Sequence, residues 1–182
     1  FLVRKANPDD LPQIYKLLDA AFGIAEGQEI GALVDELLVD PTAEPLVSLV
    51  VTQDDRIVGH VVFSAVRVGG QAEGLESAIL APLAVHPEVQ GLGLGGRLVA
   101  EGIARLRAAG TALVFVLGHP GYYPRHGFVP AGEHGLDAPY PIQPEHADAW
   151  MVRALRPDTI GRITGTVHCA DALDHPKYWV ES

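Results

Sequence analysis

Residues 90–97 of the chain read QGLGLGGR, with four glycines and one arginine among eight residues. Two phosphate-binding patterns overlap in this stretch. Gly91 opens the dinucleotide fingerprint G-x-G-x-x-G, whereas Gln90 opens the pattern Q/R-x-x-G-x-G/A. Both patterns predict backbone amides at the start of a helix, where glycines let a diphosphate approach without a clash.

The residues around the loop argue against a dinucleotide. In a nicotinamide or flavin fold the first glycine directly follows its strand, and an acidic residue about 20 positions later binds the ribose. Here residues 86–90 separate the predicted strand from Gly91, and the later stretch LVFVLG at 113–118 has no acid. No Lys-Ser/Thr pair follows the glycines, so a Walker A loop is excluded. A nucleotide-dependent oxidoreductase is therefore disfavoured.

Outward from the loop, the hydrophobic pattern predicts one α/β domain. Apolar residues recur at helical spacing in some segments, and β-branched runs bounded by turn residues mark others. The predicted strands are 1–6, the hairpin 45–70, 76–87, 111–118, 126–131, 148–155 and one further candidate at 164–170, and the predicted helices are 7–23, 28–40 and 96–110. The Pro- and Gly-rich segment 132–147 is predicted to be a loop.

The stretch LAVHPEVQGLGLGGRLV at 83–99 resembles the central motif of the GNAT acyltransferase superfamily: a strand ending L-x-V-x-P, then Q/R-x-x-G-x-G/A, then a helix. Downstream, GYYPRHGF resembles the Y-x-x-x-G-F signature of the same family, with Tyr123 five places before Phe128. LVFVLGHPGYYPRHGF is also similar to a bacterial branch of predicted N-acetyltransferases. The resemblance covers about residues 1–155.

The resemblance implies the GNAT acyltransferase fold. In this α/β fold a mixed central sheet of about seven strands is flanked by helices and splayed between its fourth and fifth strands. We expect a single acetyltransferase domain over residues 1–182, with 156–182 as a C-terminal extension or an extra strand.

The activity that the resemblance implies is that of an N-acetyltransferase, which moves an acetyl group from acetyl-CoA to a primary amine by direct transfer. The alternative is an acyl-CoA-binding sensor or regulatory module without turnover. For Arg97, contact with a phosphate and a solvated surface position are both open. The residues expected to bind the cofactor are Leu83, Ala84, Val85, Gln90, Gly91, Leu92, Gly93, Leu94, Gly95, Gly96 and Arg97.

Direct transfer needs an acid for the leaving thiolate and a route for the proton of the amine. By its spacing, Tyr123 matches the tyrosine that often serves the family as the acid, and Tyr122 is the alternative. Here the sequence departs from the common pattern, because Pro124 removes a backbone donor and shortens the expected helix. The candidate bases are Glu76, His60 and His119.

Composition limits the partners. The formal net charge of −10 argues against nucleic acid and an anionic membrane surface, and mildly favours a basic acceptor, such as a small-molecule or peptide amine. No apolar run approaches the ~18 residues of a membrane span, and the single cysteine, Cys169, fits the cytoplasm. The spacing of His119, His126 and His134 does not predict a metal site. The family resemblance leaves a homodimer as an option.

Overall fold

The structure is a computed structural model and describes residues 1–69 and 75–180. A mixed sheet runs through it in the order β1-β2-β3-β4-β5-β8-β6. Its neighbouring strands are antiparallel except for β4 and β5, which are parallel. The predicted α/β architecture is therefore confirmed, and β7 and β9 attach beside the main path. The strands are β1 Leu2–Lys5, β2 Val47–Gln53, β3 Arg56–Val68, β4 Ser77–Val85, β5 Leu113–Leu117, β6 Val129–Pro130, β7 Leu136–Asp137, β8 Trp150–Ala154 and β9 Gly165–His168.

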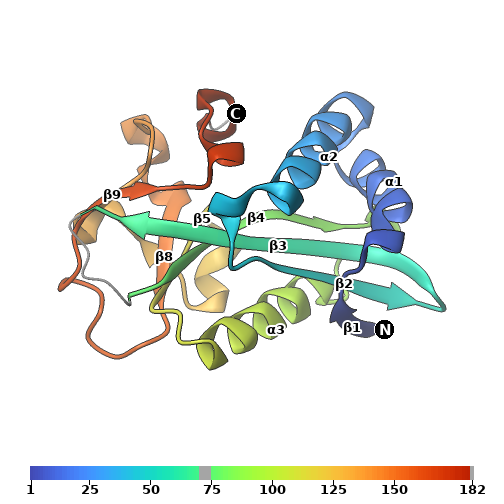
Figure 1. Cartoon of the computed structure of the whole chain (residues 1–182), viewed down its shortest axis with the longest axis horizontal. Coiled ribbons are helices and arrows are strands. Elements are labelled where there is room, and N and C mark those ends of the chain that lie inside the picture. Colours follow the sequence, from blue (N-terminus) through green and yellow to red (C-terminus); the bar gives the residue numbers. More distant parts are fainter. Residues whose placement is uncertain (70–74, 181–182) are drawn as a thin grey trace.

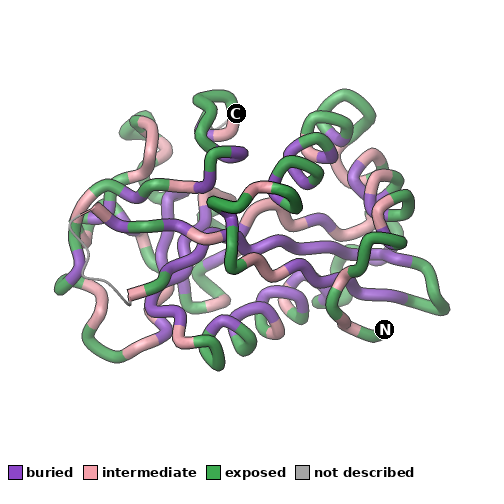
Figure 2. Tube along the Cα trace, in the orientation of Figure 1, coloured by how far each residue is buried: buried purple, intermediate pink, exposed green. Residues whose placement is uncertain are grey.

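Helices cover both faces of the sheet. Figure 1 shows α1 (Leu11–Phe22) and α2 (Ile24–Val39) on one face and α3 (Leu94–Ala108) on the other. The buried residues lie along the central strands and on the inward sides of the helices, as Figure 2 shows. The core is thus divided into two layers by the sheet, as a three-layer α/β domain requires.

The first helical region begins and ends where its sequence signals predict. Asn7 caps a short 3-10 turn, Pro8–Asp10, through a hydrogen bond from the amide of Asp9, and α1 follows directly. Gly23 ends α1 with φ of 84°, a conformation that favours glycine. The expectation that the second helix begins at Gln28 is wrong: α2 begins at Ile24, directly after Gly23.

The predicted hairpin is formed by β2 and β3. Asp54 and Asp55 connect the strands with φ values of 49° and 65°. A two-residue turn with two positive φ values matches the twist of paired strands, and aspartate tolerates it. The last residue of the predicted hairpin, Gly70, lies outside the described residues.

The two parallel strands part along their length. Residues Ser77–Ile79 of β4 pair with Leu113–Phe115 of β5. In the described register β4 continues to Val85 and β5 to Leu117 without further pairing between them. The splay that the family resemblance implies therefore lies between residues 80–85 and the end of β5.

The segment after β8 folds back onto the sheet. β9 pairs antiparallel with the end of β3 and parallel with β7, so the expectation that 132–147 has no strand is wrong at Leu136–Asp137. The ring of Trp179 packs at 5.6 Å from that of Trp150, edge to face. Residues 156–180 thereby join the hydrophobic cluster that contains α2. No helix in the described ranges has the length and apolar character needed to cross a membrane.

Candidate active site

The glycine-rich loop connects β4 to the start of α3. Gly93 is the N-cap of α3 with φ of 79°, and Gly91 has φ of 83°. Both values lie in the left-handed region, which side chains other than glycine rarely adopt. A Cβ built on either residue would meet no atom within 4 Å. The loop is thus uncovered at the Cβ positions of Gly91 and Gly93.

The amides of this loop have no acceptors among the residues that the structure describes. Arg97 makes the first backbone hydrogen bond of α3, to the carbonyl of Gly93 at 3.1 Å. None of the amides from Gly91 to Gly96 donates to another group of the described chain. A helix N-terminus with free amides carries a partial positive charge and binds anions. The Gln90 side chain donates to the Val85 carbonyl at 3.1 Å, which ties the loop to β4.

The next two glycines have a different role, because aromatic rings lie against them. A Cβ on Gly95 would lie 2.6 Å from the hydroxyl oxygen of Tyr122, and a Cβ on Gly96 would lie 3.0 Å from Cε1 of His126. The segment Tyr122–His126 therefore packs on the first turn of α3. No local signal in the sequence predicts this contact, because about 30 residues separate its two sides.

The remaining cofactor candidates lie along β4 and at the start of α3. Leu83 and Val85 are half-buried at the splay, whereas Ala84 is buried. Leu92 is exposed and Leu94 is 2% exposed, so Leu94 offers only its backbone to a ligand. Arg97 is exposed and donates from Nη1 to the Phe1 carbonyl at 3.2 Å, which favours the surface alternative.

The two tyrosines lie in different surroundings. Tyr123 is 8% exposed, and its ring packs against Cα of Gly118 at the end of β5. Burial raises its pKa well above the usual value, and its hydroxyl makes no hydrogen bond within the described residues. Tyr122 is half-buried, with its ring 5.0 Å from that of Tyr123, edge to face. Burial raises the pKa of Tyr122 as well, against the opposing charge of Arg125.

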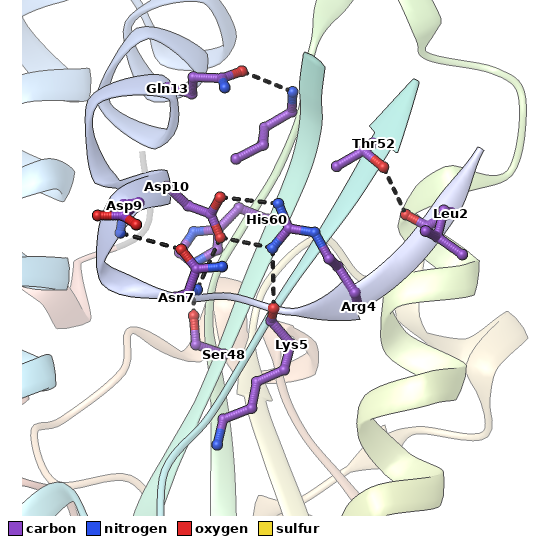
Figure 3. A network of polar contacts seen from close by, with 11 residues as sticks. Leu2, Arg4, Lys5, Asn7, Asp9, Asp10, Gln13, Ser48, Thr52 and His60 are labelled. Carbon is purple, nitrogen blue, oxygen red and sulfur yellow. Dashed lines mark hydrogen bonds and ion pairs between the residues drawn. The ribbon is translucent and has the colours of Figure 1, made fainter. Parts of the chain in front are cut away.

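Of the three candidate bases, His60 is enclosed in the core. It is 0% exposed on β3, and its Nε2 lies 3.0 Å from the Ser48 hydroxyl (Figure 3). Asp10 lies beside this pair and accepts two hydrogen bonds from the Arg4 guanidinium. Burial lowers the pKa of His60 to about 4, although the charge of Asp10 acts in the opposite direction. His60 is therefore neutral at pH 7, and its Nδ1 has no hydrogen-bond partner in residues 1–69 and 75–180.

The other two candidate bases lie at opposite ends of the splayed strands. Glu76 is exposed and directly precedes β4, about 30 Å along the strand from Val85. His119 is exposed beyond the end of β5, and its Nδ1 accepts the amide of Gly121 at 3.0 Å. The three candidates are thus not brought together.

Other reactive groups are few. The described residues contain no group of three or more His, Cys, Asp and Glu side chains that could hold a metal ion. Cys169 is half-buried, and burial raises its pKa to about 12.

Comparisons with known proteins agree with this geometry. Residues 2–131 match the acetyltransferase (GNAT) domain family. The chain is 42% identical to the uncharacterized N-acetyltransferase YjhQ of Escherichia coli strain K12, over 94% of this chain and 93% of that protein. It is 36% identical to the uncharacterized N-acetyltransferase YhbS of the same strain, over 91% and 94%.

Two solved structures resemble the whole chain. The crystal structure of YhbS from E. coli in complex with CoA aligns with a TM-score of 0.84 and 34% identity, covering 96% of this chain and 92% of that one. A GNAT family acetyltransferase from Brucella melitensis in complex with acetyl-CoA aligns with a TM-score of 0.73 and 33% identity, covering 95% and 97%. The glycine loop, the splayed strands and these relatives lead to one conclusion: the chain belongs to the GNAT family of N-acetyltransferases and is an acyltransferase of the acetyl-CoA-dependent class.

Proposed function

We propose that the protein transfers an acetyl group from acetyl-CoA to a primary amine by direct transfer. The observation that carries this proposal is the row of backbone amides from Gly91 to Gly96. They lack acceptors within the described chain, and no atom lies within 4 Å of the position of a Cβ on Gly91 or Gly93. A diphosphate supplies the acceptors and the negative charge that such a helix N-terminus favours.

The splay beside the loop suits the rest of the cofactor. Strand β4 has unpaired backbone on its β5 side from Leu80 to Val85, where an extended chain can add itself like a strand. The pantetheine arm of CoA has amide groups for such pairing. Leu83 lies half-buried on this edge, so it is the residue that we expect the arm to contact.

Tyr123 is the proposed acid. Its ring lies against Gly118 at the end of β5, and its hydroxyl has no partner in the described chain. The raised pKa keeps this hydroxyl protonated at neutral pH, so it can donate to the departing thiolate. The tyrosine alternative, Tyr122, has its hydroxyl at the first turn of α3 and is assigned to the cofactor loop instead.

We propose that water, rather than a side chain, accepts the proton of the acceptor amine. His60 is enclosed and hydrogen-bonded to Ser48, and Glu76 lies at the end of β4 that is paired with β5, away from the splay. Nδ1 of His119 already accepts the Gly121 amide, and this side chain is exposed beyond the end of β5. We expect Glu76→Gln, His60→Gln and His119→Gln to keep the low-pH limb of the kcat/KM profile.

Direct transfer also agrees with the state of the single cysteine. The raised pKa of Cys169 leaves almost no thiolate at neutral pH, and the thiolate is the nucleophilic form. We therefore expect intersecting initial-rate patterns, as a ternary complex gives, and no acetylated enzyme in intact-mass spectra.

The acceptor is proposed to be a small-molecule or peptide amine, in keeping with the net charge of −10, which attracts cations. The homodimer, the cytoplasmic location and the absence of nucleic-acid partners stay predictions.

The function is tested by an acceptor screen that follows the release of free CoA. Once an acceptor is found, Tyr123→Phe should lower kcat by at least ~100-fold, because general acid catalysis contributes ~100- to 10,000-fold. The Kd for acetyl-CoA should change less than about threefold, and Tyr122→Phe is the matched control with kcat near the wild-type value. Acetyl-CoA binding without turnover of any amine would favour the sensor instead.

The cofactor loop is tested by calorimetry on Gly93→Glu. A carboxylate at the free amides should remove most of the acetyl-CoA affinity by occupying and repelling the diphosphate. Gly161→Glu is the control, because Gly161 also has a positive φ, of 90°, and a Cβ there also meets no atom within 4 Å but lies on another segment. Unchanged affinity in a folded Gly93→Glu variant would overturn the assignment.

A further inference from the structure

His126 lies at the edge of the proposed diphosphate site. Its Cε1 and Nε2 lie 3.0 and 3.8 Å from the position of a Cβ on Gly96, one of the residues with a free amide. The ring also packs edge-on to Tyr122, with 5.0 Å between the ring centroids. Two aromatic side chains from one segment thus border the first turn of α3.

The surroundings of His126 disfavour its protonated form. Burial lowers its pKa, and the charges of Arg125 and Arg153 lower it further. Arg125 precedes it on the same turn, and Arg153 of β8 donates to the His126 carbonyl at 2.8 Å. The N-terminus of α3 lies beside the same ring and adds a partial positive charge.

One ring nitrogen is nevertheless left without a partner. Nε2 of His126 is buried and makes no hydrogen bond within the described chain. A nitrogen that is closed to water is also closed to a phosphate oxygen of similar size, so the nitrogen that a ligand can reach is Nδ1, which is not buried and lies 4.0 Å from the position of a Cβ on Gly96. A phosphate held by the Gly96 amide would bring its oxygens next to this ring.

We propose that His126 binds the diphosphate of CoA and takes up one proton from solvent when it does so. This inference rests on the proposed function, since it needs the diphosphate at the amides of Gly91–Gly96. The negative charge of the ligand offsets the three positive neighbours, so the imidazolium becomes the favoured form. The protonated ring then donates a charge-assisted hydrogen bond to a phosphate oxygen.

The sign of the pH dependence follows from the proton balance. Because the complex holds up to one more proton than the free protein, binding tightens as the pH falls toward the pKa of the free ring. A hydrogen bond to a charged group corresponds to roughly tenfold in affinity or more. We therefore expect binding to be about tenfold tighter at pH 6 than at pH 8.

The test is calorimetry of the whole chain with 3′-dephospho-CoA. This probe keeps the diphosphate but lacks the 3′-phosphomonoester, whose own titration near pH 6 would otherwise add to the signal. The binding enthalpy is measured at pH 7 in HEPES and in Tris, whose ionisation enthalpies differ and which carry no phosphate that could compete for the site. The difference between the two buffers gives the number of protons taken up per bound ligand.

Wild-type protein should take up a measurable fraction of a proton, and His126→Gln should take up none and bind about tenfold more weakly at pH 6. His134→Gln, at another half-buried histidine on a different segment, is the control and should match wild type. Because His126→Gln can also perturb the packing on α3, the ring proton of His126 is followed by NMR in wild-type protein, where its pKa should rise when 3′-dephospho-CoA binds.

The outcomes separate this inference from the function on which it rests. Binding of 3′-dephospho-CoA with no proton uptake and an unchanged His126 titration would overturn the role of His126 and leave the cofactor assignment intact. Absence of binding by both CoA and 3′-dephospho-CoA to folded wild-type protein would overturn the proposed function itself.

Discussion

The buried imidazole of His60 predicts a loss of stability in mild acid. Its pKa is lowered from 6.5 to about 4 by burial, so the folded protein resists the proton that the unfolded chain accepts. Between these two values the unfolded state binds more protons, and the free energy of unfolding therefore rises with pH. The contribution of His60 is fully present above pH 6.5 and is lost as the pH falls toward 4.

The size of the effect follows from the two pKa values. Each pKa unit corresponds to about 1.4 kcal/mol, so the whole difference corresponds to about 3 kcal/mol at pH 4 and below. At pH 5 about 2 kcal/mol of this is already lost. Asp10 has a lowered pKa and acts in the same direction, but its contribution falls away only below its usual value of 3.8. Between pH 7.5 and pH 5 the change in the free energy of unfolding therefore reports on the histidines.

The variant His60→Gln removes the titration while keeping an amide that can reach the Ser48 hydroxyl. Urea unfolding followed by tryptophan fluorescence at pH 7.5 and pH 5 gives the free energy of unfolding for each protein. Wild type should lose about 2 kcal/mol more than His60→Gln between these two pH values. His134→Gln serves as the control and should lose as much as wild type.

Equal losses in wild type and His60→Gln would refute the reasoning, because the pH dependence would then come from other groups. A wild-type protein that is more stable at pH 5 than at pH 7.5 would contradict the prediction that the free energy of unfolding rises with pH. Comparing the pH dependence of two proteins avoids any reliance on how much the substitution costs at pH 7.5.

Three further outcomes are expected. Gly102→Ala should destabilise the fold by ~1–3 kcal/mol in urea unfolding, because the added Cβ would lie 2.1 Å from the Phe63 ring, and this clash outweighs the helix propensity of alanine. A gain in stability would contradict the close contact of α3 with β3. Asp10→Asn should lower the free energy of unfolding by ~1–3 kcal/mol, because the buried carboxylate accepts hydrogen bonds from Arg4 and from the Asn7 amide. The control Asp9→Asn changes an exposed residue and should stay within ~0.5 kcal/mol of wild type. Iodoacetamide at pH 8 should alkylate Cys169 roughly a thousandfold more slowly in the native protein than in the urea-unfolded chain, because the fold raises the pKa of this thiol from 9.0 to about 12. Equal rates would show that the thiol of the native protein ionises normally.

Short-range signals in the sequence were enough to predict the central unit of the fold. The strand before the loop, the glycines and the amphipathic helix after it lie within about 30 consecutive residues, and each depends on local backbone preferences. Gly93 is needed because the N-cap of α3 has a positive φ, and Leu98, Ile103 and Leu106 are buried as their helical spacing predicts. The family resemblance carried by the same residues then predicted the splay, and in the structure the pairing of β4 with β5 does end after Ile79 and Phe115.

Other features could be decided only by the tertiary structure, because they depend on residues that are far apart in the sequence. Gly95 and Gly96 read as part of a phosphate loop, but they are also the surfaces on which Tyr122 and His126 pack. The burial of His60 depends on the helix that covers β3. Strand β7 exists because β9 pairs with it, and no alternation in its Pro- and Gly-rich surroundings could predict that. Local propensity fixes where elements begin and end, whereas burial and side-chain contact depend on which distant elements meet.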